Sequence, residues 1–135
     1  MSLIKTINFQ PLGDERGSLV ALEGNKSVPF DIKRVYYIFG TKEGVSRGFH
    51  AHRNLKQIAV CATGSCCFVL DNGKQREEVV LDKSTTGLLI NDLTWREMYD
   101  FSPDCVLMVL ASEYYDELDY IRDYDKFIRT INVKQ

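Results

Sequence analysis

Long apolar runs and a strong excess of charge are both missing from this 135-residue chain. No apolar stretch approaches the roughly 20 residues that a membrane-spanning helix requires. The formal net charge of −2 offers no general attraction to nucleic acid or to an anionic membrane surface. The opening sequence, MSLIKTINFQ, lacks the basic-then-apolar order of a signal peptide. We therefore expect a cytoplasmic globular protein with no nucleic acid and no membrane among its partners.

The cysteine spacings of a disulfide framework are missing as well. The four cysteines lie inside apolar runs, and none of them form a C-x-x-C motif. Cys66 and Cys67 are adjacent, so their side chains would point to opposite faces of a strand. The cysteines therefore predict a reduced protein, in agreement with a cytoplasmic location.

Short β-rich runs separated by turn residues fill most of the chain. The runs follow one another every eight to twelve residues without a helical pattern between them, as in LIKTINF, IKRVYYIF, LKQIAVCA, SCCFVL and CVLMVLA. The sequence DNGK is a strong hairpin signal, because Asn and Gly readily adopt the positive φ of such turns. The pattern predicts one all-β domain over residues 1–135, an antiparallel sandwich or barrel. Between Tyr115 and Ile131 apolar residues recur at helical spacing, which predicts a short helical segment against the barrel.

The only two histidines of the chain lie close together in the stretch GFHAHRNLKQ. Alternation along a strand places His50 and His52 on the same face. The spacing from Gly44 through both histidines to Gln57 resembles the first sequence motif of the cupins. This resemblance implies a cupin barrel, that is, a jelly roll or double-stranded β-helix of antiparallel strands. In cupins that bind a metal ion, the position of Gln57 is usually a glutamate ligand.

A third histidine ligand is missing. The second cupin motif would bring one near Met98, but the segment DLTWREMYDF contains no histidine. Two imidazoles and the Gln57 amide are too few strong ligands for zinc, and iron would need a carboxylate beside the imidazoles. Glu97 would supply a carboxylate only if it faced inward. We therefore predict no metal and no other cofactor. The pair then either packs in a polar corner of the barrel or does acid–base chemistry, and we favour the chemistry.

Several segments together resemble a family of cupin-fold enzymes, the nucleotide-sugar 3,4-ketoisomerases with a WxcM-like C-terminal domain. These segments are GDERGSLVALE, IKRVYYIF, RGFHAH, TWREMYDF and LASEYYDELDYIRDYDKFI. The resemblance implies a metal-free isomerisation of dTDP-4-keto-6-deoxy-D-glucose that moves the keto group from C4 to C3. The product would serve the synthesis of a 3-amino-3,6-dideoxyhexose for O-antigen or S-layer polysaccharide. The resemblance also implies a homodimer that exchanges an N-terminal strand, for which LIKTINF is the candidate.

The same resemblance assigns roles to individual residues. It implies that His50 is the principal acid–base residue, and we expect His52 to shuttle the second proton or to polarise the carbonyl. We expect Arg16 and Arg47 to bind the diphosphate, because guanidinium groups offer permanently charged, bidentate donors. We expect Tyr37, which would share a strand face with Val35 and Phe39, to aim its hydroxyl at the sugar. The expected substrate-binding residues are Arg16, Tyr37, Arg47, Arg96 and Arg122, and of these Arg16 and Arg96 would influence the configuration at C4.

Three alternatives remain open at this point. A dTDP-sugar 3,5-epimerase would have a related sequence but would need a base on each face of the sugar ring. A sugar-binding cupin without catalytic activity would have the same core but no need of two histidines that exchange protons. A metal-dependent cupin oxygenase would need a stronger set of ligands than the chain offers. The sequence does not decide whether the product has the galacto or the gluco configuration.

Overall fold

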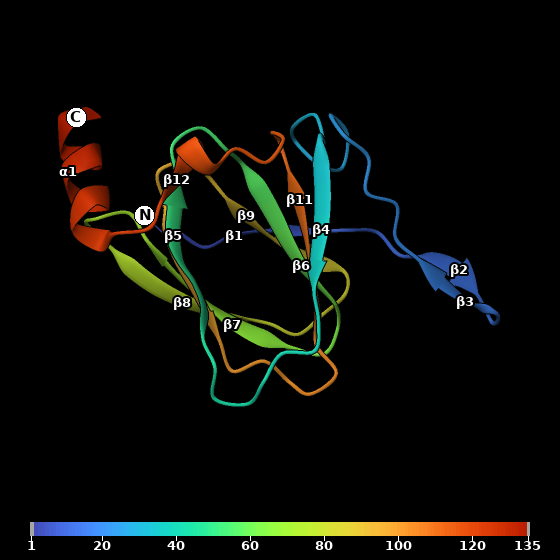
Figure 1. The fold of residues 1–135 in the computed structure, drawn as a ribbon. Helices are drawn as coiled ribbons and strands as arrows, with labels where there is room; N and C mark the ends of the chain where they lie inside the picture. Colours follow the sequence, from blue (N-terminus) through green and yellow to red (C-terminus); the bar gives the residue numbers. More distant parts are fainter. Residues whose placement is uncertain (1, 135) are drawn as a thin grey trace.

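Two five-stranded antiparallel sheets face each other in the computed structural model, which describes residues 2–134 (Figure 1). The first sheet consists, in spatial order, of β1 (Lys5–Asn8), β9 (Thr86–Ile90), β6 (Gln57–Thr63), β11 (Val106–Ala111) and β4 (Arg34–Ile38). The second consists of β12 (Tyr120–Ile121), β5 (Arg47–His52), β10 (Trp95–Tyr99), β7 (Cys66–Asp71) and β8 (Arg76–Leu81). Consecutive strands alternate between the sheets over much of the chain, as in a jelly roll. The predicted all-β cupin architecture is confirmed.

The first sheet is covered on both faces. Along β6, Ala59 and Cys61 point between the sheets into the main apolar core, whereas Ile58 and Val60 point to the opposite face. That outer face is covered by the segment of residues 20–32, which packs Val28 and other apolar side chains onto it. Because both sets of side chains are removed from water, the first five residues of β6 are all buried, and the strand is a nearly continuous apolar run.

A C-terminal helix covers the outer face of the second sheet. The helix α1 (Tyr124–Lys134) places Phe127 and Ile131 against Ala51 of β5 and Trp95 of β10, and all four side chains are buried. Residues 2–134 contain two helical segments, this helix and the short turn before it. Neither segment has the length and hydrophobicity that a membrane crossing needs.

The segment before α1 differs from the predicted helix. Its first part is a 3₁₀ turn, η1 (Glu117–Asp119), followed by the strand β12, so only the second half of the predicted span is helical. Asp116 caps the turn by accepting a hydrogen bond from the backbone N–H of Leu118 at 3.0 Å. Tyr120 then pairs with the open edge of β5 as a strand residue opposite His52. Pairing with this sheet edge therefore outweighs the tendency to form a helix that the spacing of apolar residues indicated.

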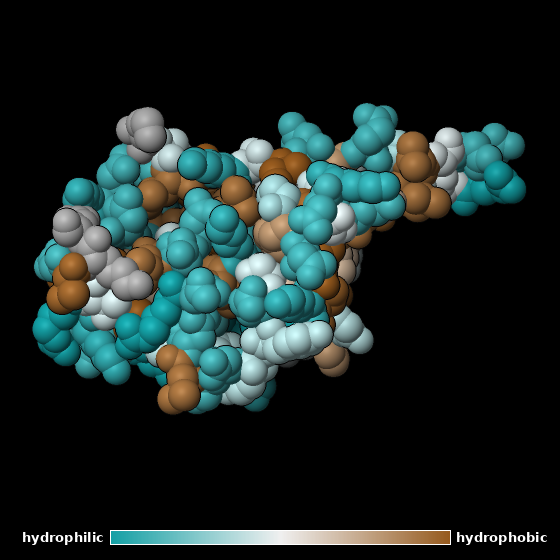
Figure 2. All heavy atoms as spheres, turned by 90° about the horizontal axis from the view of Figure 1, so that it is seen from above, coloured by the Kyte–Doolittle hydropathy of each residue, from teal (hydrophilic) through white to brown (hydrophobic). Residues whose placement is uncertain are grey.

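The hairpin of β2 (Leu12–Asp14) and β3 (Gly17–Leu19) stands away from the barrel as an arm (Figures 1 and 2). Arg16 lies in its turn, where its exposed guanidinium pairs with Asp14 at 2.6 Å. The strand β1 before the arm pairs with β9 of the same chain. The N-terminal region thus consists of a strand built into the barrel and an arm that is not.

Candidate active site

A bulge in β5 shapes the strand that carries both histidines. Gly48 and Phe49 have φ angles of 91° and 59°, and the register with β10 shifts beside them. A Cβ atom on Gly48 would lie 3.0 Å from the carbonyl oxygen of Arg96, so the two strands can approach this closely only at a glycine. Beyond the bulge the rings of His50 and His52 meet edge to face, with centroids 5.0 Å apart. The predicted placement of both histidines on one face is confirmed.

A buried guanidinium lies beside the histidines. Arg96 on β10 is 2% exposed, and its Nη1 donates a hydrogen bond to the Oε1 atom of Gln57. Its Nη2 donates to the carbonyl oxygen of Thr94 at 3.1 Å, and its Nε has no partner within residues 2–134. Gln57 in turn donates from Nε2 to the hydroxyl of Tyr36 at 3.1 Å. The side chain at the usual glutamate position of a cupin therefore holds the cation of an arginine.

A carboxylate fixes the orientation of the second histidine. The Nδ1 atom of His52 lies 3.0 Å from the Oδ2 atom of Asp119, and the backbone N–H of Asn54 donates to the other carboxylate oxygen at 2.8 Å. Since an ionised carboxylate only accepts, Nδ1 of His52 carries the proton and Nε2 is left as the basic nitrogen. Asp119 reaches this place because β12 pairs with β5 directly after it.

Tyr120 forms the wall of the site next to both imidazoles. Its ring centroid is 4.4 Å from that of His52 and 5.2 Å from that of His50. The guanidinium carbon of Arg122 lies 4.1 Å from the centre of the Tyr120 ring and forms a cation–π contact there. Arg122 also pairs with Glu117 at 3.0 Å, rather than with the two aspartates nearer to it in the chain. The C-terminal segment therefore brings aromatic and charged groups to the histidines.

Burial and nearby positive charge keep both imidazoles neutral. Burial, followed by the charge of Arg96, lowers the pKa of His50 to about 4, although a backbone hydrogen bond with Gly48 opposes this change. The same two causes, with the charge of His50 added, lower the pKa of His52 to about 2. The contact of His52 with Asp119 is therefore a hydrogen bond from a neutral ring, not an ion pair. Burial also lowers the pKa of Arg96 to about 10, so this guanidinium stays charged at neutral pH.

The prediction that Tyr37 lines the cavity is wrong, and its neighbour Tyr36 points inward instead. Tyr37 is 63% exposed on the outer side of β4, together with Val35. Tyr36 points inward because the alternation of the edge strand places Arg34, Tyr36 and Ile38 toward the other sheet. The sequence pattern allowed either register, and the face with more apolar residues proved to be the exposed one.

The structure brings some of the other predicted site residues together at the histidines and leaves two of them, Arg16 and Arg47, away from this cluster. His50, His52 and Arg96 lie together, with Arg122 beyond Tyr120. Arg16, on the arm, and Arg47, exposed at the start of β5, contact neither histidine in the part of the chain that the structure describes. Glu97 does not face inward, because its carboxylate accepts hydrogen bonds from Trp95 and Arg76, both at 2.9 Å, on the outer side of the sheet.

Sequence reasoning missed four groups of the site, namely Arg34, Tyr36, Asp119 and Tyr120. Arg34 stacks over the rings of Tyr36 and Tyr115, and its charge also contributes to the low pKa of His52. The alternation of β4 places Arg34 and Tyr36 on the same face, but it does not tell which face of this edge strand points inward. Asp119 and Tyr120 gave no such signal, because their role depends on a strand of two residues.

The groups that converge here suit proton transfer next to a carbonyl. A neutral imidazole accepts a proton from carbon, and a second one returns a proton to a neighbouring atom. The fixed guanidinium and the tyrosine hydroxyls stabilise the negative charge that develops on oxygen between the two steps. The burial of Arg96 increases this effect, since charges interact more strongly away from water.

The low pKa values of the histidines predict how stability depends on pH. An unfolded histidine binds a proton near pH 6.5, whereas folded His50 does so only near pH 4, so acid favours the unfolded state within this window. We expect the unfolding free energy of the native chain, relative to that of His50→Asn, to fall by roughly 2–3 kcal/mol from pH 7 to pH 4. Urea denaturation at several pH values measures it. A difference that does not change with pH would contradict the neutral histidine.

Comparison with known proteins places these features in a family. The profile of the FdtA family (WxcM-like, C-terminal) matches residues 2–132. A TDP-4-oxo-6-deoxy-α-D-glucose 3,4-oxoisomerase from Aneurinibacillus thermoaerophilus is 56% identical over 97% of this chain and 96% of its own. The sugar 3,4-ketoisomerase from Thermoanaerobacterium thermosaccharolyticum, solved with TDP, is 44% identical, with a TM-score of 0.94 over 97% of this chain and 96% of its own. A variant of that enzyme solved with TDP-4-keto-6-deoxyglucose is 42% identical, with a TM-score of 0.94 over 99% and 97%.

A more distant structure shares the fold alone. An epimerase from Mycobacterium tuberculosis is 18% identical, with a TM-score of 0.71 over 85% of this chain and 66% of its own. The matches to the ketoisomerases have much higher identity and cover almost the whole chain, so the matched region includes the strands that carry the histidines and Arg96. The chain belongs to the FdtA family of WxcM-like C-terminal domains.

Proposed function

We propose that this chain is a sugar-nucleotide 3,4-ketoisomerase that converts dTDP-4-keto-6-deoxy-D-glucose into the dTDP-3-keto-6-deoxyhexose. The observation that carries the proposal is the pair of neutral imidazoles beside a buried guanidinium. The 56% identity to a 3,4-oxoisomerase supports the same reaction. The product would be the substrate of an aminotransferase that makes a 3-amino-3,6-dideoxyhexose for surface polysaccharide. The four free cysteines agree with a cytoplasmic enzyme.

The reaction is two proton transfers through an enediolate. The C3 proton is acidic because it lies next to the C4 carbonyl, and His50 removes it as the base. The electrons of that C–H bond move toward the C4 oxygen, where Arg96 and Tyr36 stabilise the negative charge. A proton then adds to C4, and the proton of the C3 hydroxyl passes to the C4 oxygen, which leaves a carbonyl at C3 and a hydroxyl at C4. His52, held by Asp119, is the second group that exchanges protons.

The groups of the site also suit a reaction without a metal ion. In a cupin metal site the side chain at position 57 would face the ion, and here it faces the guanidinium of Arg96. A fixed guanidinium would repel a divalent cation next to it. It supplies a permanent positive charge of its own, so the oxyanion can be stabilised without a Lewis acid.

The diphosphate of the substrate needs further cations at the rim. Arg122 is the nearest exposed candidate, since it lies over the Tyr120 ring at the edge of the histidine site. Arg47 lies at the other end of β5, and Arg16 lies on the arm. Both are exposed and would need either movement or a second copy of the chain to reach a shared ligand.

Turnover of the substrate in D₂O, followed by proton NMR, tests the reaction. We expect the native chain to form the 3-keto isomer with deuterium at C4. His50→Asn should reduce the rate about 10²- to 10⁴-fold, the usual contribution of a general base. Arg129→Gln, a change at an exposed residue of α1, is the control and should retain the native rate. Exchange at C3 and C5 without migration of the keto group would favour an epimerase, and binding without any exchange would favour a sugar-binding protein.

Asp119 acts through His52 and is therefore a positioning residue. We expect Asp119→Asn to lower kcat about 10- to 100-fold with little change in KM, which corresponds to the loss of one hydrogen bond to a charged group. Nitrogen-15 NMR should show a mixture of His52 tautomers in the variant instead of the Nδ1–H form alone. Asp31→Asn, at an exposed position, is the matched control. A variant with an unchanged tautomer and unchanged kcat would show that the carboxylate is structural.

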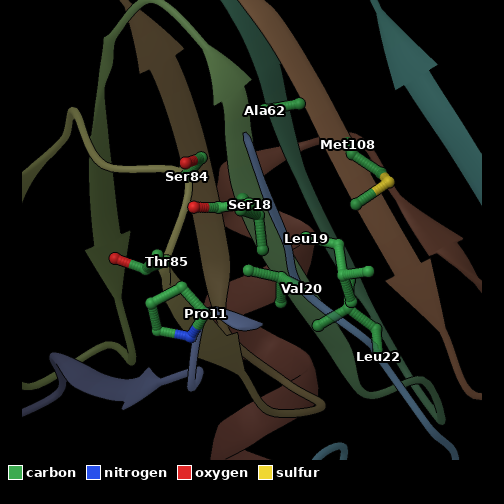
Figure 3. Close-up of a pocket in the computed structure, with 10 residues that line it drawn as sticks. Pro11, Ser18, Leu19, Val20, Leu22, Ala62, Ser84, Thr85 and Met108 are labelled. Carbon is green, nitrogen blue, oxygen red and sulfur yellow. The ribbon is translucent and has the colours of Figure 1, made fainter. Parts of the chain in front are cut away.

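We infer that the chain forms a homodimer by exchange of the arm rather than of β1. Leu12 and Leu19 on the arm are 54% and 58% exposed, and Tyr37 on the outer side of β4 is 63% exposed. A pocket of about 320 Å³ lies between the arm and the first sheet, where Leu19, Val20 and Leu22 face Ala62 and Met108 (Figure 3). A second arm of the same chain, related by a twofold axis, would cover these apolar side chains on both copies.

In such a dimer Arg16 would complete the site of the partner subunit, which a mixing experiment tests. Two inactive variants, Arg16→Ala and His50→Asn, are co-expressed with different tags, and the mixed dimer is purified. If Arg16 acts across the interface, one site of the mixed dimer has both residues, and about half the native activity per dimer should return. No recovery of activity, or a monomer in solution, would contradict the exchange.

A further inference from the structure

Three buried cysteines converge at the end of the barrel away from the histidines. Cys61 comes from β6, Cys66 from β7, and Cys105 from the residue just before β11. The Sγ atom of Cys61 lies 3.6 Å from that of Cys66 and 3.8 Å from that of Cys105, and all three sulfur atoms are within 4.8 Å of one another. None of these side chains is more than 2% exposed. The proposed isomerisation uses none of them.

The sulfur atoms are spaced like the ligands of a single ion. Thiolates bound to one ion at about 2.3 Å in tetrahedral geometry have their sulfur atoms a little under 4 Å apart. Two of the three separations here already have this length. Within residues 2–134 no fourth histidine, cysteine or carboxylate joins the cluster, so the ion would have three protein ligands. A soft, thiophilic ion that accepts three ligands fits this set.

The charges around the cluster decide which soft ion fits. The carboxylates of Asp82 and Asp104 act on the thiols, and the three cysteines otherwise belong to the main apolar core. Zinc or copper(I) bound by three thiolates would form a complex with net negative charge, which burial and the two carboxylates both oppose. Trivalent arsenic with three thiolates is neutral and therefore carries no such cost.

We propose that Cys61, Cys66 and Cys105 form a binding site for trivalent arsenic, taken up as arsenous acid. Three S–As bonds form and three As–O bonds break, and each thiol proton leaves with a hydroxide of the acid as water. Neither arsenic nor sulfur changes its oxidation state.

Two surface turns control entry to the cluster. The turn between β6 and β7 packs so closely on the turn before β11 that a Cβ atom on Gly64 would lie 2.7 Å from the Cα of Cys105. The backbone N–H groups of Ser65 and Ser102 hold the turns together, donating to the Ser102 hydroxyl and the Ser65 carbonyl, each at 2.9 Å. Ser65 and Ser102 also line a surface pocket. Arsenous acid in that pocket reaches the thiols when the turns separate, so uptake is slow.

Mass spectrometry of the intact native chain after incubation with sodium arsenite tests the site. We expect one arsenic atom per chain, with the loss of three hydrogen atoms, and a melting temperature that rises with arsenite concentration because the ion binds the folded state. Cys61→Ala, Cys66→Ala and Cys105→Ala should each lose the adduct. Cys67→Ala is the matched control, because its side chain leaves β7 on the opposite face, and it should keep the adduct.

Two results would overturn the proposal. One is the absence of an adduct, both after long incubation and after refolding with arsenite present, which removes the entry barrier. The other is an adduct that all three alanine variants retain. A parallel incubation with Cd²⁺ tests the charge argument, and cadmium bound in preference to arsenite would also overturn it. Circular dichroism establishes that each variant is folded before it is compared.

Discussion

The active site depends on one buried contact, the hydrogen bond between the guanidinium of Arg96 and the amide of Gln57. A charged group that is 2% exposed is stable only where polar partners surround it, and here the partners are an amide, a carbonyl and, through Gln57, a tyrosine hydroxyl. Burial, followed by the same charge, lowers the pKa of both imidazoles and keeps them neutral. The cation therefore holds the site together and also sets the protonation state that proton transfer needs.

In this site a guanidinium takes the place that a metal ion has in other cupins. A metal ion in that place would make use of the histidines as ligands and leave neither free to move protons. With a guanidinium there, the positive charge is retained while both imidazoles keep a free nitrogen. The glutamine at position 57 makes this possible, because a neutral amide accepts the hydrogen bond of Arg96 without cancelling its charge.

Much of this fold is visible in the sequence, because strand alternation and turn chemistry are local properties. The position of His50 and His52 on one face follows from the period of a strand, and Gln57 from its spacing to them. The choice between Tyr36 and Tyr37 does not follow, since β4 is an edge strand with apolar residues on both faces. Asp119 and Tyr120 depend on an edge left open by β5, a property of the folded sheet rather than of their own segment.

The interior of the barrel is divided along its length. Gln57, Arg96 and the histidines occupy one end, and the cysteines lie with aromatic and aliphatic side chains at the other. The cysteines belong to the main apolar core, whereas the partners of Arg96 at the other end are polar groups. The chemistry proposed for this chain is therefore confined to the polar end of the barrel.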